Sequence, residues 1–214
     1  MTKDVFSVKD TLSKLVQKYK HLTYLLIYLL LYLWFLQLEK IIRPIYNMYC
    51  ALDSMIPFEP AFVVPYLLWF GYVGLAVAYY AFFSKEDYFK LLHFIYLSMA
   101  ICLLIYMFFP NGQSLRVRFY EQDVFSQMVR DIQTNDTPTN VAPSMHVTFS
   151  LGVHMSLCHS KKLGRFIALR AGSFVMMVLI CLSTVFIKQH SVLDGLYAII
   201  LSAVLYLLIY RRGL

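Results

Sequence analysis

Two short segments combine histidine with residue types that phosphate chemistry uses. The first is Pro143-Ser144-Met145-His146, where a polar stretch gives way to an apolar one. Proline is favoured at the first position of a helix, so the amides that follow should be free at a helix N-terminus, which binds phosphate. Ser144 adds a hydroxyl donor, and His146 adds a proton that could pass to a leaving oxygen. The alternative is a plain helix start with a histidine at the membrane interface.

The second segment runs from Ser183 to Asp194 and reads Ser-Thr-Val-Phe-Ile-Lys-Gln-His-Ser-Val-Leu-Asp. On a helix, the His-x3-Asp spacing would put His190 and Asp194 on one face and in contact. A carboxylate that holds one nitrogen of an imidazole leaves the other free as a base or nucleophile. Asp194 is also the only acidic residue that we place in a membrane span, where ionisable side chains are costly and often functional. The alternative is a His–Asp pair that only joins two helices.

The elements that must position these segments are membrane helices. Of the 214 residues, 60% are hydrophobic and 14% are charged, whereas soluble domains carry about 25% charged residues. Apolar blocks long enough to cross about 30 Å of hydrocarbon lie at 22–38, 61–83, 91–109, 166–187 and 192–210. A shorter block at 145–158 has to be a further crossing if the basic loop after it is cytoplasmic. We therefore expect an all-α integral membrane protein with six transmembrane helices.

Basic residues set the predicted orientation, because cytoplasmic loops are rich in Lys and Arg. Most of the 19 Lys and Arg residues lie in the N-terminal arm, after the second and fourth spans, and at the C-terminus. We therefore expect a cell-membrane protein with cytoplasmic termini, a cytoplasmic arm at 1–20 and one six-helix membrane catalytic domain at 21–214. We read the first apolar block as a retained span rather than a cleaved signal peptide. Both histidine segments and the long polar loop at 110–143 would then lie at the external face.

Composition also limits the partners. The net charge of +7 is explained by this topology and by attraction to anionic membrane lipids, and we find no nucleic-acid-binding motif. The cysteines lack paired spacing and the acidic residues are scattered, so we expect no disulfide framework, no metal and no cofactor. The sequence does not indicate an oligomeric state. The cysteines are Cys50, Cys102, Cys158 and Cys181.

The two segments together resemble a known family. Pro-Ser-Met-His followed by Ser-Thr-x5-His-x3-Asp is similar to the second and third motifs of the type 2 phosphatidic acid phosphatase (PAP2) superfamily, usually Pro-Ser-Gly-His and Ser-Arg-x5-His-x3-Asp. The resemblance covers about residues 58–210 and includes the six-helix layout. It implies that His190 is a nucleophile that forms a phosphohistidine, that Asp194 orients it, and that His146 protonates the leaving lipid alcohol. It also implies that substrate is bound by Ser144, by the neighbouring Met145 and by Ser183.

The first motif of the family, Lys-x6-Arg-Pro, resembles the stretch that ends in Asn-Gly-Gln-Ser-Leu-Arg-Val. This resemblance implies that Arg116 clamps the phosphate. The chain departs from the family where Phe109 replaces the lysine, Val117 replaces the proline and Thr184 replaces the arginine of the third motif. Phosphoryl transfer relies on cations around the phosphate. Lys188, close to His190 in sequence, is a candidate substitute for the missing charges.

The resemblance implies a metal-independent phosphatase that hydrolyses a phosphomonoester or diphosphate lipid at the outer membrane face. Phosphatidic acid, phosphatidylglycerol phosphate and a polyprenyl diphosphate are candidate substrates that the sequence does not rank. Thr184 keeps open a lipid phosphotransferase of the sphingomyelin or inositol phosphorylceramide synthase type. The missing cations keep open a non-catalytic lipid transporter.

Overall fold

The computed structural model describes residues 13, 14, 16–118 and 122–211. Lys3, Lys9 and Arg212, which contribute to the predicted orientation, lie outside the described residues. The elements in chain order are η1 (Lys20–Leu25), α2 (Leu26–Ile41), β1 (Tyr46–Asn47), α3 (Ala51–Met55), η2 (Pro60–Phe62), α4 (Val63–Phe83), α5 (Lys85–Phe108), β2 (Asn111–Gly112), α6 (Val124–Asn135), α7 (Met145–His159), α8 (Ile167–Phe186), α9 (Val192–Tyr206) and η3 (Leu207–Arg211).

Five helical segments of the described chain are long and apolar enough to cross a membrane: Val16–Ile41, Pro60–Phe83, Lys85–Phe108, Ile167–Phe186 and Val192–Arg211. The chain therefore has the helices of a multi-pass membrane protein, as its composition predicted. The helices extend beyond the apolar blocks, because backbone hydrogen bonding continues where the side chains become polar. The first begins at Val16, inside the predicted arm at 1–20. Glu39, Glu86 and Asp87 lie at the ends of these helices, outside the apolar blocks, so the placement of Asp194 as the only acidic residue in a span stays a prediction.

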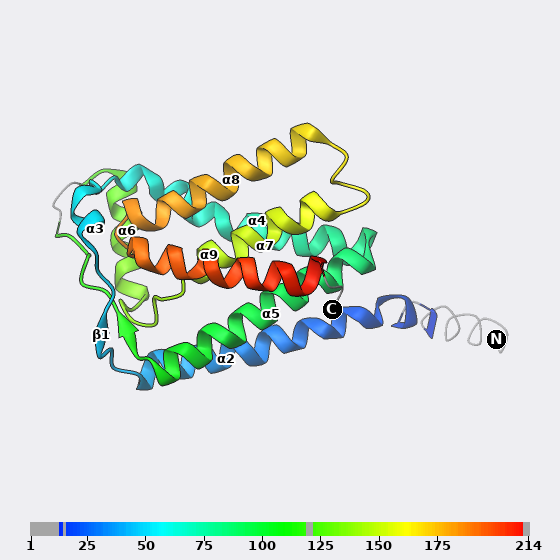
Figure 1. Ribbon diagram of the computed structural model, residues 1–214, viewed down its shortest axis with the longest axis horizontal. Coiled ribbons are helices and arrows are strands. Elements are labelled where there is room, and N and C mark those ends of the chain that lie inside the picture. The colour runs from blue at the N-terminus through cyan, green and yellow to red at the C-terminus, as the bar shows by residue number, and fades with distance from the viewer. Residues whose placement is uncertain (1–12, 15, 119–121, 212–214) are drawn as a thin grey trace, which may run out of the picture.

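Successive helices of the bundle run in alternating directions (Figure 1). The connections from α2 to α4, from α5 to α7 and from α8 to α9 therefore meet at one end, where α3, α6 and β1 also lie. The turn from α4 to α5, the connection from α7 to α8 and the C-terminal helix end lie at the opposite end. The segments with candidate chemistry thus share one end of the bundle.

The short apolar block predicted as a sixth span forms α7. This helix has 15 residues, which corresponds to about 22 Å and is shorter than the roughly 30 Å hydrocarbon layer. It packs against α4, α5, α8 and α9, and a side chain on its Gly152 would collide with the ring of Phe94, 2.5 Å from the ideal Cβ position. The surrounding helices therefore enclose α7 and shield it from lipid. Its polar residues, including those at the candidate site, can then lie inside the bundle.

A two-residue parallel ladder joins two of the connections at the site end. Tyr46 pairs with Asn111 and Asn47 pairs with Gly112. A Cβ atom on Gly112 would lie 2.7 Å from the carbonyl oxygen of Pro138 and 2.8 Å from Cβ of Pro44. Only glycine lets these three chain segments approach this closely.

Candidate active site

The expected contact between His190 and Asp194 forms, with Nδ1 of His190 3.1 Å from Oδ2 of Asp194. The Asp194 side chain is fully buried and 11% of the His190 side chain is exposed. A buried carboxylate at this distance holds the imidazole with Nδ1–H towards it, which leaves Nε2 with a free lone pair. The pair therefore has the geometry of an oriented nucleophile or base.

The local structure behind this contact differs from the shared helix face that the spacing predicted. His190 lies before the helix, and Ser191 is the N-cap of α9. The Oδ2 atom of Asp194 also accepts a hydrogen bond of 2.9 Å from the amide of Ser191, which completes a capping box. The cap fixes the carboxylate, and the chain entering the helix brings His190 to it.

His146 lies in the first turn of α7, between two aromatic rings of α4. The ring centroids of Tyr66 and Trp69 are each 4.3 Å from that of His146, and the His190 centroid is 6.0 Å away. The Nε2 atom of His146 is buried and has no hydrogen-bond partner among the described residues. The imidazole is thus held in place and keeps one nitrogen available for a substrate atom.

Two hydrogen bonds hold the residues at the start of α7, one within the helix start and one from α5. Ser144, rather than Pro143, borders the helix, and its buried hydroxyl accepts a 3.5 Å hydrogen bond from the amide of Val147. The carbonyl of Pro143 accepts a 2.7 Å hydrogen bond from the hydroxyl of Tyr106. The Ser144 hydroxyl, which was predicted to donate to a phosphate, therefore serves here as the acceptor of a helix cap. The amides of Met145 and His146 remain first-turn donors without an intrahelical acceptor.

Arg116 lies beside the site, but it is occupied by protein acceptors. Its Nη1 atom donates to the carbonyls of Gln133 and Asp136 at 2.9 and 3.0 Å, and its Nη2 atom donates to Oε1 of Gln189 at 3.0 Å. Desolvation by burial lowers the pKa of Arg116 below its usual value. Arg116 therefore caps the C-terminal end of α6 and reaches the site through Gln189, which precedes His190.

The structure does not bring the side chains of Lys188 and Ser183 into the site. Lys188 has a left-handed backbone with φ 57°, and its Nζ atom donates to the carbonyls of Asp53 and Ile56 at 2.7 and 2.5 Å. Desolvation by burial lowers the pKa of Lys188. Ser183 is fully buried and donates to the carbonyl of Ile180 in its own helix at 2.6 Å. The Lys188 ammonium is therefore directed at α3 and does not replace the missing motif charges.

Asp53 of α3 is a site residue that the sequence did not indicate. It is 3% exposed, and its carboxylate accepts hydrogen bonds from the Ser191 hydroxyl at 2.6 Å and from the amides of Val192 and Cys50, each at 2.8 Å. Desolvation raises the pKa of Asp53, but these hydrogen bonds outweigh it and leave the pKa below the usual 3.8. Asp53 thus anchors the turn that carries His190.

Two amides in the loop after α5 hold the same region together. The Asn111 side chain accepts from the amides of Val141 and Ala142 at 2.9 and 2.8 Å, and it donates to the Ala142 carbonyl. The Gln113 side chain donates to the Lys188 carbonyl at 3.2 Å. One loop therefore anchors both the entry to α7 and the turn before α9, which fixes the two histidines relative to each other.

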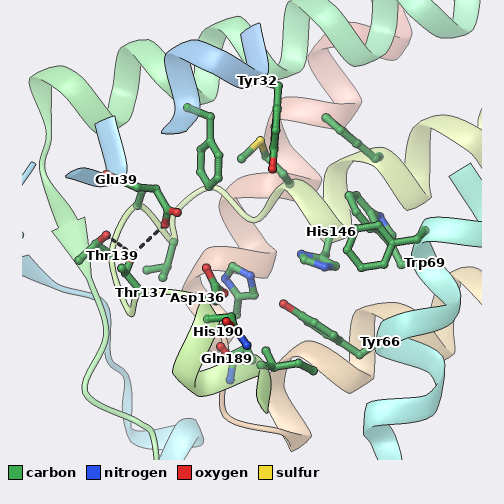
Figure 2. Close-up of a pocket in the computed structure, with 18 of the residues that line it drawn as sticks. Tyr32, Glu39, Tyr66, Trp69, Asp136, Thr137, Thr139, His146, Gln189 and His190 are labelled. Atoms are coloured by element: carbon green, nitrogen blue, oxygen red, sulfur yellow. Dashed lines mark hydrogen bonds between the residues drawn. The ribbon is translucent and has the colours of Figure 1, made fainter. Parts of the chain in front are cut away.

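A cavity of about 490 Å³ opens on both imidazoles. Figure 2 shows the His146 and His190 rings at the same space, with Tyr66 beside them and Glu39, Thr137 and Thr139 further along the wall. Met145 also lines the cavity. Met145, His146 and His190 are the residues predicted from the sequence that do so; most of the other lining residues are aromatic or polar.

The lining is acidic rather than basic. Glu39, Asp131 and Asp136 face the cavity, and no Lys or Arg side chain lines it within the described part of the chain. Desolvation raises the pKa of Asp136 above the usual 3.8, against the opposing attraction of Arg116 and His190. An anion bound in the cavity would therefore contact histidine side chains and helix amides. The Arg116 guanidinium would be separated from it by the side chain of Gln189.

Among the described residues, no group of three or more His, Cys, Asp or Glu side chains is placed to hold a metal ion. No protein-family model, no curated protein and no solved structure matches the chain.

Proposed function

We propose that this protein is a lipid phosphate phosphatase that works through a phosphohistidine at His190. The observation that carries the proposal is the pair of imidazoles at one cavity, with ring centroids 6.0 Å apart and one of them held by a buried carboxylate at 3.1 Å. A group bound between two such rings can be attacked by one and protonated by the other. The motif resemblance to the PAP2 superfamily adds to this geometry.

In the proposed reaction, Nε2 of His190 attacks the phosphorus of the substrate. The N–P bond forms as the bond between phosphorus and the lipid oxygen breaks, and His146 gives its proton to that oxygen. Asp194 balances the positive charge on the phosphorylated imidazole, and the negative phosphate favours the protonated form of His146 beside it. His146 then takes a proton from a water molecule that attacks the phosphohistidine, which releases phosphate and restores both histidines.

The phosphate oxygens would be held largely by neutral donors. The first-turn amides of Met145 and His146 point along the helix axis towards the N-terminal end, where the helix dipole favours an anion. Arg116 is connected to the site by its 3.0 Å hydrogen bond to Gln189. Its charge acts across this amide rather than by direct contact with the substrate.

The proposal includes six crossings and an external site. Helix α7 runs from the site end of the bundle to the opposite end, where the basic residues Lys161 and Lys162 follow it. With α7 counted as a crossing, we propose a six-helix, PAP2-like arrangement in which His190 lies at the outer face of the cell membrane, the side that the distribution of basic residues favours. The surrounding helices would compensate for the short length of α7.

The acidic and aromatic lining favours a second candidate, a lipid phosphotransferase. Glu39 and Asp136, together with the rings of Tyr66 and Trp69, form an environment that attracts a cationic amine. A phosphodiester lipid with a cationic head group would fit this lining. The phospho-head group would then pass from His190 to a second lipid alcohol instead of to water.

The test is a phosphate-release assay on purified protein in detergent, with EDTA present. The panel contains phosphatidic acid, phosphatidylglycerol phosphate, a polyprenyl diphosphate and a phosphodiester lipid with a cationic head group, each with and without a lipid alcohol acceptor. The parental protein and the control His154→Ala should release phosphate, whereas His190→Ala should not. Product that appears only with the acceptor would identify the phosphotransferase. Binding of these lipids without release or transfer would show a non-catalytic lipid protein and contradict both candidates.

A further inference from the structure

A second cavity of about 470 Å³ adjoins the cavity at the histidines. Four side chains, Tyr28, Trp69, Phe70 and Phe149, line both cavities. The two spaces therefore meet at shared walls, with Trp69 in contact with the His146 ring on one side. The second cavity therefore lies within reach of a molecule whose other end is at the histidines.

The second cavity is an apolar groove. Its walls come from the start of the first membrane helix, from α4, from α5 and from one residue of α7, and none of them is charged among the residues described. The residues other than the four shared ones are Leu22, Leu25, Val73, Gly74, Val77, Ala78, Ala81, Phe82, Leu92, Ile95 and Tyr96. The groove can exclude water but offers little to recognise a polar group.

The groove has the length of a lipid chain. Its wall on α4 runs from Trp69 to Phe82, which is about 20 Å along a helix axis at 1.5 Å per residue. One leaflet contributes about half of the roughly 30 Å hydrocarbon layer. The groove therefore extends past the depth that a chain reaches in its own leaflet.

We propose that this groove binds a hydrocarbon chain of the same lipid whose phosphate is bound at His190, and that it selects for chain length. The inference rests on the proposed function, because it takes the phosphate end of the lipid to be at the histidines. Chains that fill the groove to Phe82 make more van der Waals contacts with its walls than shorter chains do, and such packing, rather than transfer from water, drives association within a membrane. Because Trp69 contacts both the chain position and His146, a bound chain also helps to place the phosphate.

Glycine positions on α4 allow a matched test. A Cβ atom on Gly74 or on Gly71 would meet nothing within 4 Å, so neither position excludes a residue larger than glycine at its backbone. Gly74 lines the groove, whereas Gly71 does not. Gly74→Leu should block the groove, and Gly71→Leu is the control for adding the same side chain to the same helix.

The first measurement is kcat/KM for phosphatidic acids of increasing chain length, with nitrophenyl phosphate as a chain-free substrate. For Gly74→Leu, we expect a loss of about 10-fold or more on long chains, because the leucine side chain takes the place of the lipid chain against the groove wall and removes its packing contacts. Short-chain and chain-free substrates should react at the parental rate. Gly71→Leu should match the parental protein on every substrate. An unchanged dependence on chain length in Gly74→Leu, or an equal loss in Gly71→Leu, would overturn the proposal.

The second measurement does not depend on turnover. A phosphatidic acid with a photoactivatable group near the end of its chain should cross-link to the wall between Val73 and Phe82, and Gly74→Leu should remove this product. If no lipid releases phosphate but the cross-link forms in the parental protein and is absent in Gly74→Leu, the phosphatase proposal is rejected and the chain-binding site is supported. Phosphate release without cross-linking to the groove would instead support the phosphatase proposal and reject the chain-binding site. Equal competition by diacylglycerol would show an ordinary bilayer lipid and also reject it.

Discussion

Asp53 accepts a hydrogen bond of 2.6 Å from the hydroxyl of Ser191, a residue that lies 138 positions later in the chain. The same carboxylate accepts from the amide of Val192. Ser191 caps the helix that begins with Val192, and the cap holds Asp194 against His190. A carboxylate from a short helix near the start of the bundle therefore fixes the turn that carries the proposed nucleophile.

We predict that Asp53→Asn lowers both stability and activity at neutral pH. Loss of a charged acceptor leaves buried donors poorly satisfied, which costs about 1–3 kcal/mol. The pKa of Asp53 is below its usual value, so its stabilisation is present above about pH 4 and is lost as the pH falls through the lower folded-state pKa. Thermal unfolding in detergent should show a difference from the parental protein that is large at pH 7 and shrinks below about pH 4.

The control is Ser54→Ala, because Ser54 lies on the same short helix, is exposed, and donates only to the carbonyl of Ala51. It should unfold like the parental protein at each pH. A melting temperature of Asp53→Asn equal to that of the parental protein at pH 7 would show that Asp53 does not anchor the turn.

Much of the site could be predicted from local sequence. The contact between His190 and Asp194 is made at the first turn of α9, and the segment from Pro143 to His146 forms the start of α7. Both features are local, so residue spacing is enough to predict them. Because successive helices run in alternating directions, the starts of α7 and α9 then lie at the same end of the bundle. The direction of the Lys188 side chain could not be predicted, because it depends on the left-handed φ of 57° and on acceptors supplied by α3. The role of Asp53 depends on a partner far along the chain.

The aromatic residues around His146 were missed for a different reason. Tyr66 and Trp69 lie in an apolar span rich in rings, where they resemble the interfacial aromatics of any membrane helix. One signal was available, since their spacing puts both on the same face of a helix. The spacing does not show that this face meets His146. The packing of α4 on α7 determines that contact.

Gly112→Ala should destabilise the site end of the bundle. The added Cβ would come within 2.7 Å of a backbone oxygen, and relief requires movement of the paired loops. Overpacking of this kind costs about 1–3 kcal/mol. Gly172→Ala is the matched control, because its Cβ would meet nothing within 4 Å. Equal unfolding temperatures for Gly112→Ala and Gly172→Ala would mean that the loop contact is easily relaxed.

Cysteine labelling on each side of α7 tests whether this helix crosses the membrane. Thr134 and Lys161 are exposed positions before and after it. In a cysteine-free background in intact cells, an impermeant thiol reagent should label Thr134→Cys. Lys161→Cys should react only after the membrane is permeabilised. Labelling of both from the same side would exclude α7 as a crossing and remove the six-span topology.

The acid role of His146 predicts a dependence on the leaving group. His146→Ala should slow hydrolysis of a lipid phosphate by about 10²–10⁴-fold, the usual contribution of general acid catalysis. The defect should shrink for nitrophenyl phosphate, because nitrophenolate leaves without a proton. His154→Ala, on the same helix but bonded to Ser173, should show no such difference. Equal defects of His146→Ala on both substrates would remove His146 from the acid role.

Trapping the phosphoenzyme tests the central claim most directly. Purified protein is mixed with a lipid phosphate that carries radioactive phosphorus, quenched in alkali, which preserves phosphohistidine and destroys acyl phosphate, and then digested. The account predicts label on the peptide that contains His190, full retention of this label in His154→Ala, and none in His190→Ala. Phosphate release at the parental rate by His190→Ala, or label on another residue of the parental protein, would contradict it.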